Sequence, residues 1–151
     1  MIEKRHTVRK YLDKPLDVDL ISLLNARIEQ NNELYDLTLK LVMNNSDGIS
    51  SLARLMSNNT VQNYIILAGK ECSSLDEKIG YCGADLILYA QSLGLNTWWC
   101  GGMFNGKNAL KHLYDKDVRV NGVIAIGYGK TQGVPHKSKT CLLYTSPSPR
   151  D

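Results

Sequence analysis

Two apolar runs constrain the fold of this 151-residue chain more than any other feature. Residues 61–70, VQNYIILAGK, and residues 121–129, NGVIAIGYG, are rich in β-branched side chains that do not alternate with polar ones. This pattern indicates strands that are covered on both faces, because a strand with one face in water alternates apolar and polar residues. We therefore expect a sheet that lies between two layers of helices.

Periodicity in the rest of the chain predicts the elements that supply these layers. Apolar side chains spaced by three and four residues predict helices over 16–30 and 76–93, with Gly94 ending the second. Leucines that alternate with polar residues from 37 to 41 predict a half-buried strand. Three shorter elements are also expected: a helical turn or two within 46–59, a strand at 96–100 and a helix at 108–115.

Gly80 and Gly83 lie inside the predicted helix 76–93, where glycine lowers helix propensity. Close packing against another backbone, for example across a subunit interface, would explain glycine at these positions.

Composition and charge exclude several classes of function. A net charge of +3 is too small to indicate nucleic-acid binding. The longest apolar runs fall far short of the ~20 residues that cross a bilayer. None of the four cysteines belongs to a C-x-x-C pair and the three histidines are scattered, so we expect no metal site. The pattern is typical of reduced thiols in a cytoplasmic protein.

A basic segment near the start of the chain, KRHTVRK at 4–10, holds a mixture of donors. Arg5, His6, Thr7 and Arg9 provide two guanidiniums, an imidazole and a hydroxyl within five residues. A phosphate monoester is bound by such a mixture of forked charged donors and a short hydroxyl. On its own, however, so short a basic stretch is more typical of a solvated N-terminus than of a phosphate site.

A second basic segment, GYGKTQGVPHKSK at 127–139, directly follows the second apolar run. Its glycines permit close backbone approach, and Lys137 and Lys139 stand close enough in sequence to bind the same anion. A glycine turn with lysines is also common surface material. No G-x-G-x-x-G opens a helix after an early strand and no Walker lysine loop is present, which argues against Rossmann and P-loop sites.

Four segments taken together, in this order, resemble the nitroreductase family of FMN-dependent oxidoreductases, in particular its short branch. They are KRHTVRKY, NYIILAGK, EKIGYCGADLILYAQSLGLNTWWCGG and VIAIGYGKTQGVPHKSK, and the resemblance covers residues 2–140. It implies an α+β fold, a three-layer α/β/α sandwich with a mixed, largely antiparallel sheet that is incomplete at the C-terminus.

The resemblance also implies which residues bind FMN. Around its phosphate and ribityl chain it places Arg5, His6, Thr7 and Arg9, with Lys137 and Lys139 completing the phosphate site. Beside the isoalloxazine ring it places the turn formed by Cys100, Gly101 and Gly102. We interpret Trp98 and Trp99 as core and interface packing and Cys82 as a small buried hydrophobe, and we assign His112 no role.

The implied chemistry is hydride transfer from NAD(P)H through the flavin to a nitroaromatic, quinone or similar small-molecule acceptor. It requires no catalytic side chain and no metal, because the cofactor carries the reaction. A homodimer is implied, since the family builds its flavin site at the subunit interface. Two alternatives stay open: a flavin-binding module for storage or sensing without turnover, and a fragment that binds nothing.

The last eleven residues, CLLYTSPSPRD at 141–151, depart from the family pattern. Members of this branch continue past the phosphate loop and carry a segment resembling APTAMNQQ, which this chain lacks. A DNA string that encodes residues 141–151 resembles a transposase adapter used for sequencing libraries. We expect residues 1–140 to be a truncated nitroreductase-like domain and residues 141–151 to be a non-native tail. Because relatives usually have a few more helical residues before this segment, we also expect Met1 to be an internal methionine. The alternative is a genuine disordered tail, which the Ser/Pro content permits.

Overall fold

A computed structural model describes residues 5–132 of the chain. Its eight elements, in chain order, are α1 (Val18–Tyr35), β1 (Lys40–Val42), α2 (Ser51–Met56), β2 (Tyr64–Gly69), α3 (Leu75–Ser92), β3 (Asn96–Cys100), α4 (Gly106–Lys111) and β4 (Arg119–Gly127). The four strands form one sheet in the order β1-β2-β4-β3, and each neighbouring pair is antiparallel.

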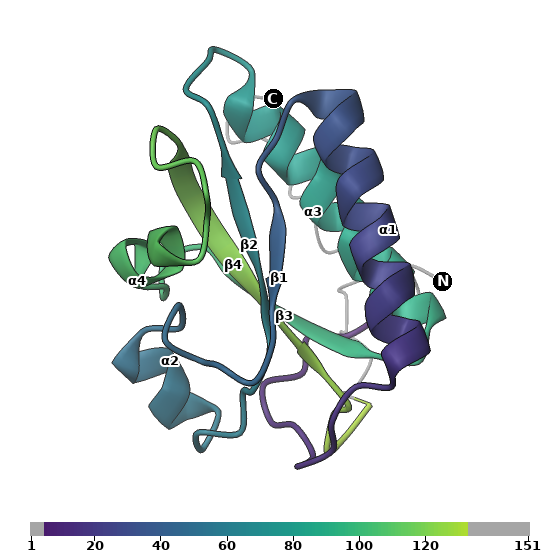
Figure 1. The fold of residues 1–151 in the computed structure, drawn as a ribbon. Coiled ribbons are helices and arrows are strands. Elements are labelled where there is room, and N and C mark those ends of the chain that lie inside the picture. The colour runs from purple at the N-terminus through teal and green to yellow at the C-terminus, as the bar shows by residue number, and fades with distance from the viewer. Residues whose placement is uncertain (1–4, 133–151) are drawn as a thin grey trace, which may run out of the picture.

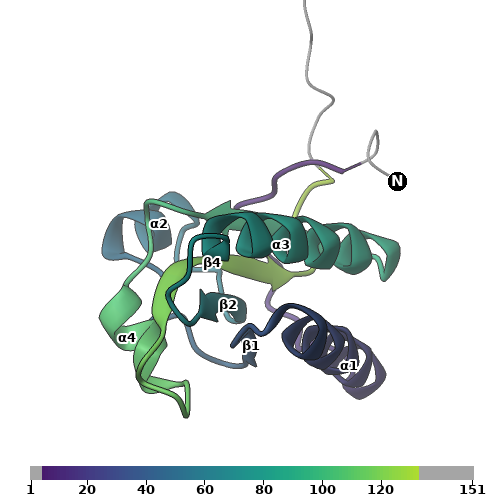
Figure 2. The ribbon, with the colours of Figure 1, turned by 90° about the horizontal axis from the view of Figure 1, so that it is seen from above.

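The sheet lies between two helical layers, as the apolar runs predicted. Figure 1 shows α1 and α3 against one face and α2 and α4 on the other, and Figure 2 shows the same three layers from above. Every residue of β2 is buried, as a strand covered on both faces requires. The α+β, three-layer fold that the resemblance implied is therefore confirmed.

Alternate residues of the two central strands serve two separate cores. Ile65, Leu67 and Ile124 pack with the buried faces of α1 and α3. Tyr64 and Ile66 face the other way, into a second core that contains Ala53 of α2 and Ala109 of α4. Because each central strand is apolar on both sides, neither face of the sheet could be left in water without a large loss of buried apolar area.

The two long predicted helices are present, and α1 continues past residue 30 to Tyr35. Polar side chains stabilise this extra length, which apolar periodicity does not report. Asn31 donates from Nδ2 to Asp85 Oδ2 of α3 at 3.0 Å, and Asn32 bonds the backbone of Leu39 in both directions. The predicted helix 108–115 instead begins at Gly106, because the Asn105 side chain caps the Asn108 N–H, and it ends at Lys111.

The glycines of α3 differ from the expectation of backbone packing. A Cβ on Gly83 would lie 2.4 Å from two carbons of the Trp99 indole, so the close neighbour is a side chain of the same chain. A Cβ on Gly80 would meet nothing within 4 Å. Gly94 has a φ of +78° and ends the helix as predicted.

The N-terminal segment extends the sheet beyond β3. Thr7 forms a parallel bridge with Thr97, and the Val8 N–H donates to the Thr97 carbonyl at 3.1 Å. Tyr11 then forms an antiparallel bridge with Gly129. This isolated parallel bridge lies at the β3 edge, whereas every strand pair of the four-stranded sheet is antiparallel. None of the helices within residues 5–132 is both long enough and apolar enough to span a membrane.

Candidate cofactor site

The basic N-terminal segment lies along β3 because one of its residues is buried. Val8 is 3% exposed and anchors the segment, while Thr7 and Arg9 on either side are exposed. In an extended chain alternate residues share a side, so Arg5, Thr7 and Arg9 lie together and His6 lies on the side of Val8. One contact agrees: Arg5 Nη2 donates to Thr7 Oγ1 at 3.4 Å. The Arg9 guanidinium lies 5.5 Å from the centre of the Trp98 ring.

Arg5 has an unused hydrogen-bond donor. Its Nε is buried, and the described residues provide no acceptor for it. A buried guanidinium N–H without a partner is unfavourable unless a further acceptor is present. Thr7, beside it, is an exposed residue that carries a hydroxyl. These groups fit an anionic phosphate, which accepts from guanidinium and hydroxyl donors alike.

The turn after β3 has an open backbone. Cys100 pairs with Val123 and is buried, whereas Gly101 and Gly102 are exposed. A Cβ on Gly102 would meet nothing within 4 Å, and one on Gly101 would lie 3.5 Å from Trp99 Nε1. A planar ring can therefore approach these backbone groups closely.

The Cys100 thiol is not poised as a nucleophile. Burial raises its pKa to about 12, although Arg9 acts in the opposite direction. The neutral thiol is the stable form at physiological pH, and the thiolate is the reactive one.

The second basic segment starts beside the first. The Leu12 N–H donates to the Tyr128 carbonyl at 2.7 Å, and the Lys130 N–H donates to the Lys10 carbonyl at 2.9 Å. Two basic segments more than a hundred residues apart in sequence are thus joined by backbone hydrogen bonds. Lys137 and Lys139 lie outside the described residues, so their predicted place at the phosphate stays a prediction.

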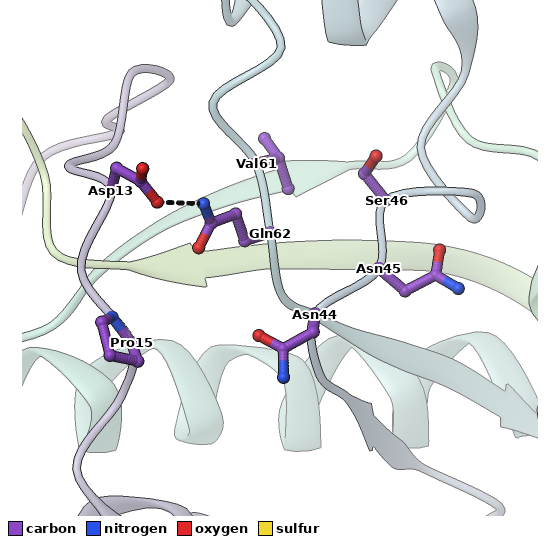
Figure 3. Close-up of a pocket in the computed structure, with 7 residues that line it drawn as sticks. All are labelled: Asp13, Pro15, Asn44, Asn45, Ser46, Val61 and Gln62. Atoms are coloured by element: carbon purple, nitrogen blue, oxygen red, sulfur yellow. Dashed lines mark hydrogen bonds between the residues drawn. The ribbon is translucent and has the colours of Figure 1, made fainter.

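A polar pocket of about 690 Å³ lies elsewhere, where β1 ends and β2 begins (Figure 3). It is lined by Asp13, Pro15, Asn44, Asn45, Ser46, Val61 and Gln62, none of which the sequence assigned to the cofactor. Gln62 Nε2 donates to Asp13 Oδ1 at 2.6 Å, between two residues that line the pocket (Figure 3). Within residues 5–132 no cluster of three His, Cys, Asp or Glu side chains could hold a metal ion.

Comparison with known proteins identifies the family. The model of the family described as "Putative TM nitroreductase" matches residues 1–145. This chain belongs to that nitroreductase family. The match runs past Thr140, and the predicted division into residues 1–140 and a non-native tail at 141–151 stays a prediction. No curated protein matches the chain.

Solved structures share the fold of this nitroreductase-family chain. An FMN-dependent nitroreductase from Clostridium difficile R20291 superposes with a TM-score of 0.72 at 16% identity, covering 91% of this chain and 92% of that one. A "putative nitroreductase in complex with FMN" from Exiguobacterium sibiricum 255-15 gives 0.69 at 11% identity, covering 96% and 94%. A "Putative NADH dehydrogenase/NAD(P)H nitroreductase" from Bacteroides thetaiotaomicron VPI-5482 gives 0.68 at 20% identity, covering 91% and 89%.

One polar cluster was missed from the sequence, where His112 received no role. His112 Nε2 lies 3.0 Å from both carboxylate oxygens of Asp47, and the Tyr64 hydroxyl donates to Asp47 Oδ1 at 2.6 Å. The three residues come from the loop after β1, from β2 and from the C-terminal end of α4. No local pattern relates residues this far apart, so only the tertiary structure reveals the cluster.

Proposed function

We propose that this nitroreductase-family chain binds FMN and, as a homodimer, carries hydride from NAD(P)H to a nitroaromatic, quinone or similar small-molecule acceptor. The observation that carries the proposal is the buried Nε of Arg5, which has no acceptor among residues 5–132. It lies beside the Thr7 hydroxyl, next to the strand that ends in the open glycine turn. Family membership and the similarity to FMN-dependent structures support it.

Each residue has a binding rather than a chemical role in this proposal. Arg5, Thr7 and Arg9 would bind the phosphate and ribityl chain, and Lys137 and Lys139 would neutralise the remaining charge. His6 lies on the opposite side of the segment and would not share these contacts. Gly101 and Gly102 would bring backbone N–H groups to the edge of the isoalloxazine ring, and the buried Cys100 would anchor the start of that turn through its pairing with Val123. Bound FMN would supply the hydride-accepting and hydride-donating chemistry.

FMN titration of the full chain tests the binding part of the proposal. Arg5→Gln should weaken FMN by ~1.5–3 kcal/mol, the usual contribution of a hydrogen bond to a charged group. Lys10→Gln is the matched control, because it removes the same charge from the same segment but from the side of Val8. Flavin fluorescence should show a large loss of affinity only for Arg5→Gln. Equal losses in both variants would mean that only net charge matters, against the proposed contact.

Turnover and assembly need separate measurements. The FMN-loaded chain should oxidise NADH or NADPH when a quinone or nitroaromatic compound is added, and its mass in solution should be twice the 16.9 kDa of one chain. FMN binding without NAD(P)H oxidation would favour the storage or sensing alternative. No FMN binding at all would favour the fragment that binds nothing.

A further inference from the structure

The turn at Gly101 and Gly102 is fixed at both of its ends. Before it, Cys100 is held by the pairing of β3 with β4. After it, the chain pairs with residues 48–50: the Ser50 N–H donates to the Met103 carbonyl at 3.2 Å, and Ile49 forms an antiparallel bridge with Phe104. In the same pairing the Asn105 N–H donates to the Gly48 carbonyl at 2.8 Å. Since glycine restricts the backbone little, these two ends determine where the turn lies.

The 48–50 segment is itself held by the residue that precedes it. The Asp47 carboxylate accepts from the Tyr64 hydroxyl and lies 3.0 Å from His112 Nε2, so one side chain joins this loop to β2 and α4. The Asp47 carbonyl also accepts from Asn108 Nδ2 at 3.2 Å. Hydrogen bonds to a charged group are stronger than neutral ones, so this carboxylate is the main polar attachment of the loop.

Packing and charge both suit this attachment. A Cβ on Gly48 would lie 2.5 Å from the Tyr64 ring, so the backbone rests directly on the buried ring. Burial acts to raise the pKa of Asp47, but hydrogen bonds from Tyr64 and His112 outweigh it and hold the pKa below its ordinary value of 3.8. The carboxylate is therefore ionised at neutral pH, in the form that accepts from both partners.

We propose that Asp47, held by His112 and Tyr64, is a positioning residue that sets the place of the Cys100–Gly102 turn. The proposal extends the proposed function, because in that function the turn contacts the isoalloxazine ring. Asp47 acts through residues 48–50 and Met103–Asn105 and touches no cofactor. Its loss should therefore change the environment of the ring and leave the phosphate contacts of Arg5 and Thr7 in place.

Hydrogen exchange tests the proposal without flavin. In the full chain, Asp47→Asn keeps the shape of the side chain but removes its charge, and the amides from Gly101 to Asn105 should exchange faster by about tenfold. Asp85→Asn is the matched control, because it breaks an ion pair with Arg27 in the opposite helical layer. Faster exchange at the turn in both variants, or in neither, would overturn the proposal.

Tyr64→Phe provides a second test of the proposal if the Asp47→Asn protein does not fold. It removes one hydroxyl and retains the ring under Gly48, so exchange at the turn should rise by a smaller factor of about threefold. Unchanged exchange at Gly101 and Gly102 in a folded Tyr64→Phe protein would count against the proposal.

The flavin-loaded protein provides the second readout. Asp47→Asn should shift the absorption bands and reduction potential of bound FMN and lower kcat by roughly tenfold or more, with the FMN Kd within about threefold of wild type. An unchanged spectrum, potential and kcat would refute the positioning role of Asp47. The proposed function would still stand in that case, provided that the wild-type chain binds FMN. If the wild-type chain bound no FMN, the proposed function would fail, and the exchange experiment alone would decide whether Asp47 positions the turn.

Discussion

Two glycines of one helix should respond in opposite ways to the same substitution. Gly80 and Gly83 both lie inside α3, and alanine at either position gains the ~1 kcal/mol by which it exceeds glycine in helix propensity. At Gly80, which is exposed, the new methyl meets nothing within 4 Å. We expect Gly80→Ala to raise the free energy of unfolding by ~0.5–1 kcal/mol.

At Gly83 the methyl has no room. It would lie 2.4 Å from Trp99 Cη2 and Cζ3, well inside van der Waals contact, and the indole is a rigid ring. The nitrogen edge of that ring lies close to Gly101 and Gly122, so the ring cannot move away freely. Overpacking of this kind costs ~1–3 kcal/mol, which exceeds the gain in propensity. We expect Gly83→Ala to lower the free energy of unfolding by ~1 kcal/mol, about 2 kcal/mol below Gly80→Ala.

Urea and thermal unfolding followed by circular dichroism measure this difference. For a chain of this length, 2 kcal/mol corresponds to roughly 4–8 °C between the midpoints of the two variants. The double variant Gly83→Ala/Trp99→Phe assigns the cause, because the smaller ring should recover part of the loss. Equal stability of Gly80→Ala and Gly83→Ala would refute the reasoning, since it would mean that Trp99 does not occupy the space above Gly83.

Acid stability and thiol reactivity follow from other buried groups. The hydrogen bond from Arg27 lowers the pKa of Asp85, so this pair contributes stability above the unfolded-state pKa of ~3.9 and loses it as pH falls through the lower folded value. Asp85→Asn should therefore lower the free energy of unfolding by ~0.5–1 kcal/mol at neutral pH and make its decline below about pH 4 less steep. Urea titrations at several pH values measure this. An unchanged dependence of the unfolding free energy on pH in the acid range would contradict the prediction. Burial raises the pKa of Cys82 to about 11 and of Cys100 to about 12, whereas Cys72 is exposed. Thiol labelling at about pH 8, followed by peptide mass spectrometry, should modify Cys72 quickly, and Cys82 and Cys100 only after unfolding. Rapid labelling of Cys100 in the native protein would contradict this prediction.

The layers of the fold could be predicted because their signals are local in the sequence. Uninterrupted apolar runs identified β2 and β4, and spacing by three and four residues identified α1 and α3. Helix ends were predicted less well, since polar contacts such as that between Asn31 and Asp85 extend α1 without any apolar periodicity. Residues that pair over short distances in sequence are visible in patterns, and residues that pair across the fold are not.

The candidate site shows the same limit. The chemistry of Arg5 and Thr7 suits a phosphate, but the resemblance to the family was needed to assign them to FMN. The structure brings the two side chains together and provides no acceptor for Arg5 Nε among residues 5–132. The supports of the Gly101–Gly102 turn could not be predicted, because Asp47 and His112 are 65 residues apart. A histidine on a short polar helix looks like surface until the loop that faces it is known.

The same turn is supported from both helical layers. On the α2 and α4 side, Asp47 holds the segment that pairs with Met103. On the α3 side, the Trp99 indole fills the space between Gly83 and the backbone of Gly101. If both supports act, Gly83→Ala should speed hydrogen exchange at Gly101 as well as lower stability, whereas Gly80→Ala should leave that amide unchanged. Normal exchange at Gly101 in Gly83→Ala would leave the Asp47 side as the support that sets the place of the turn.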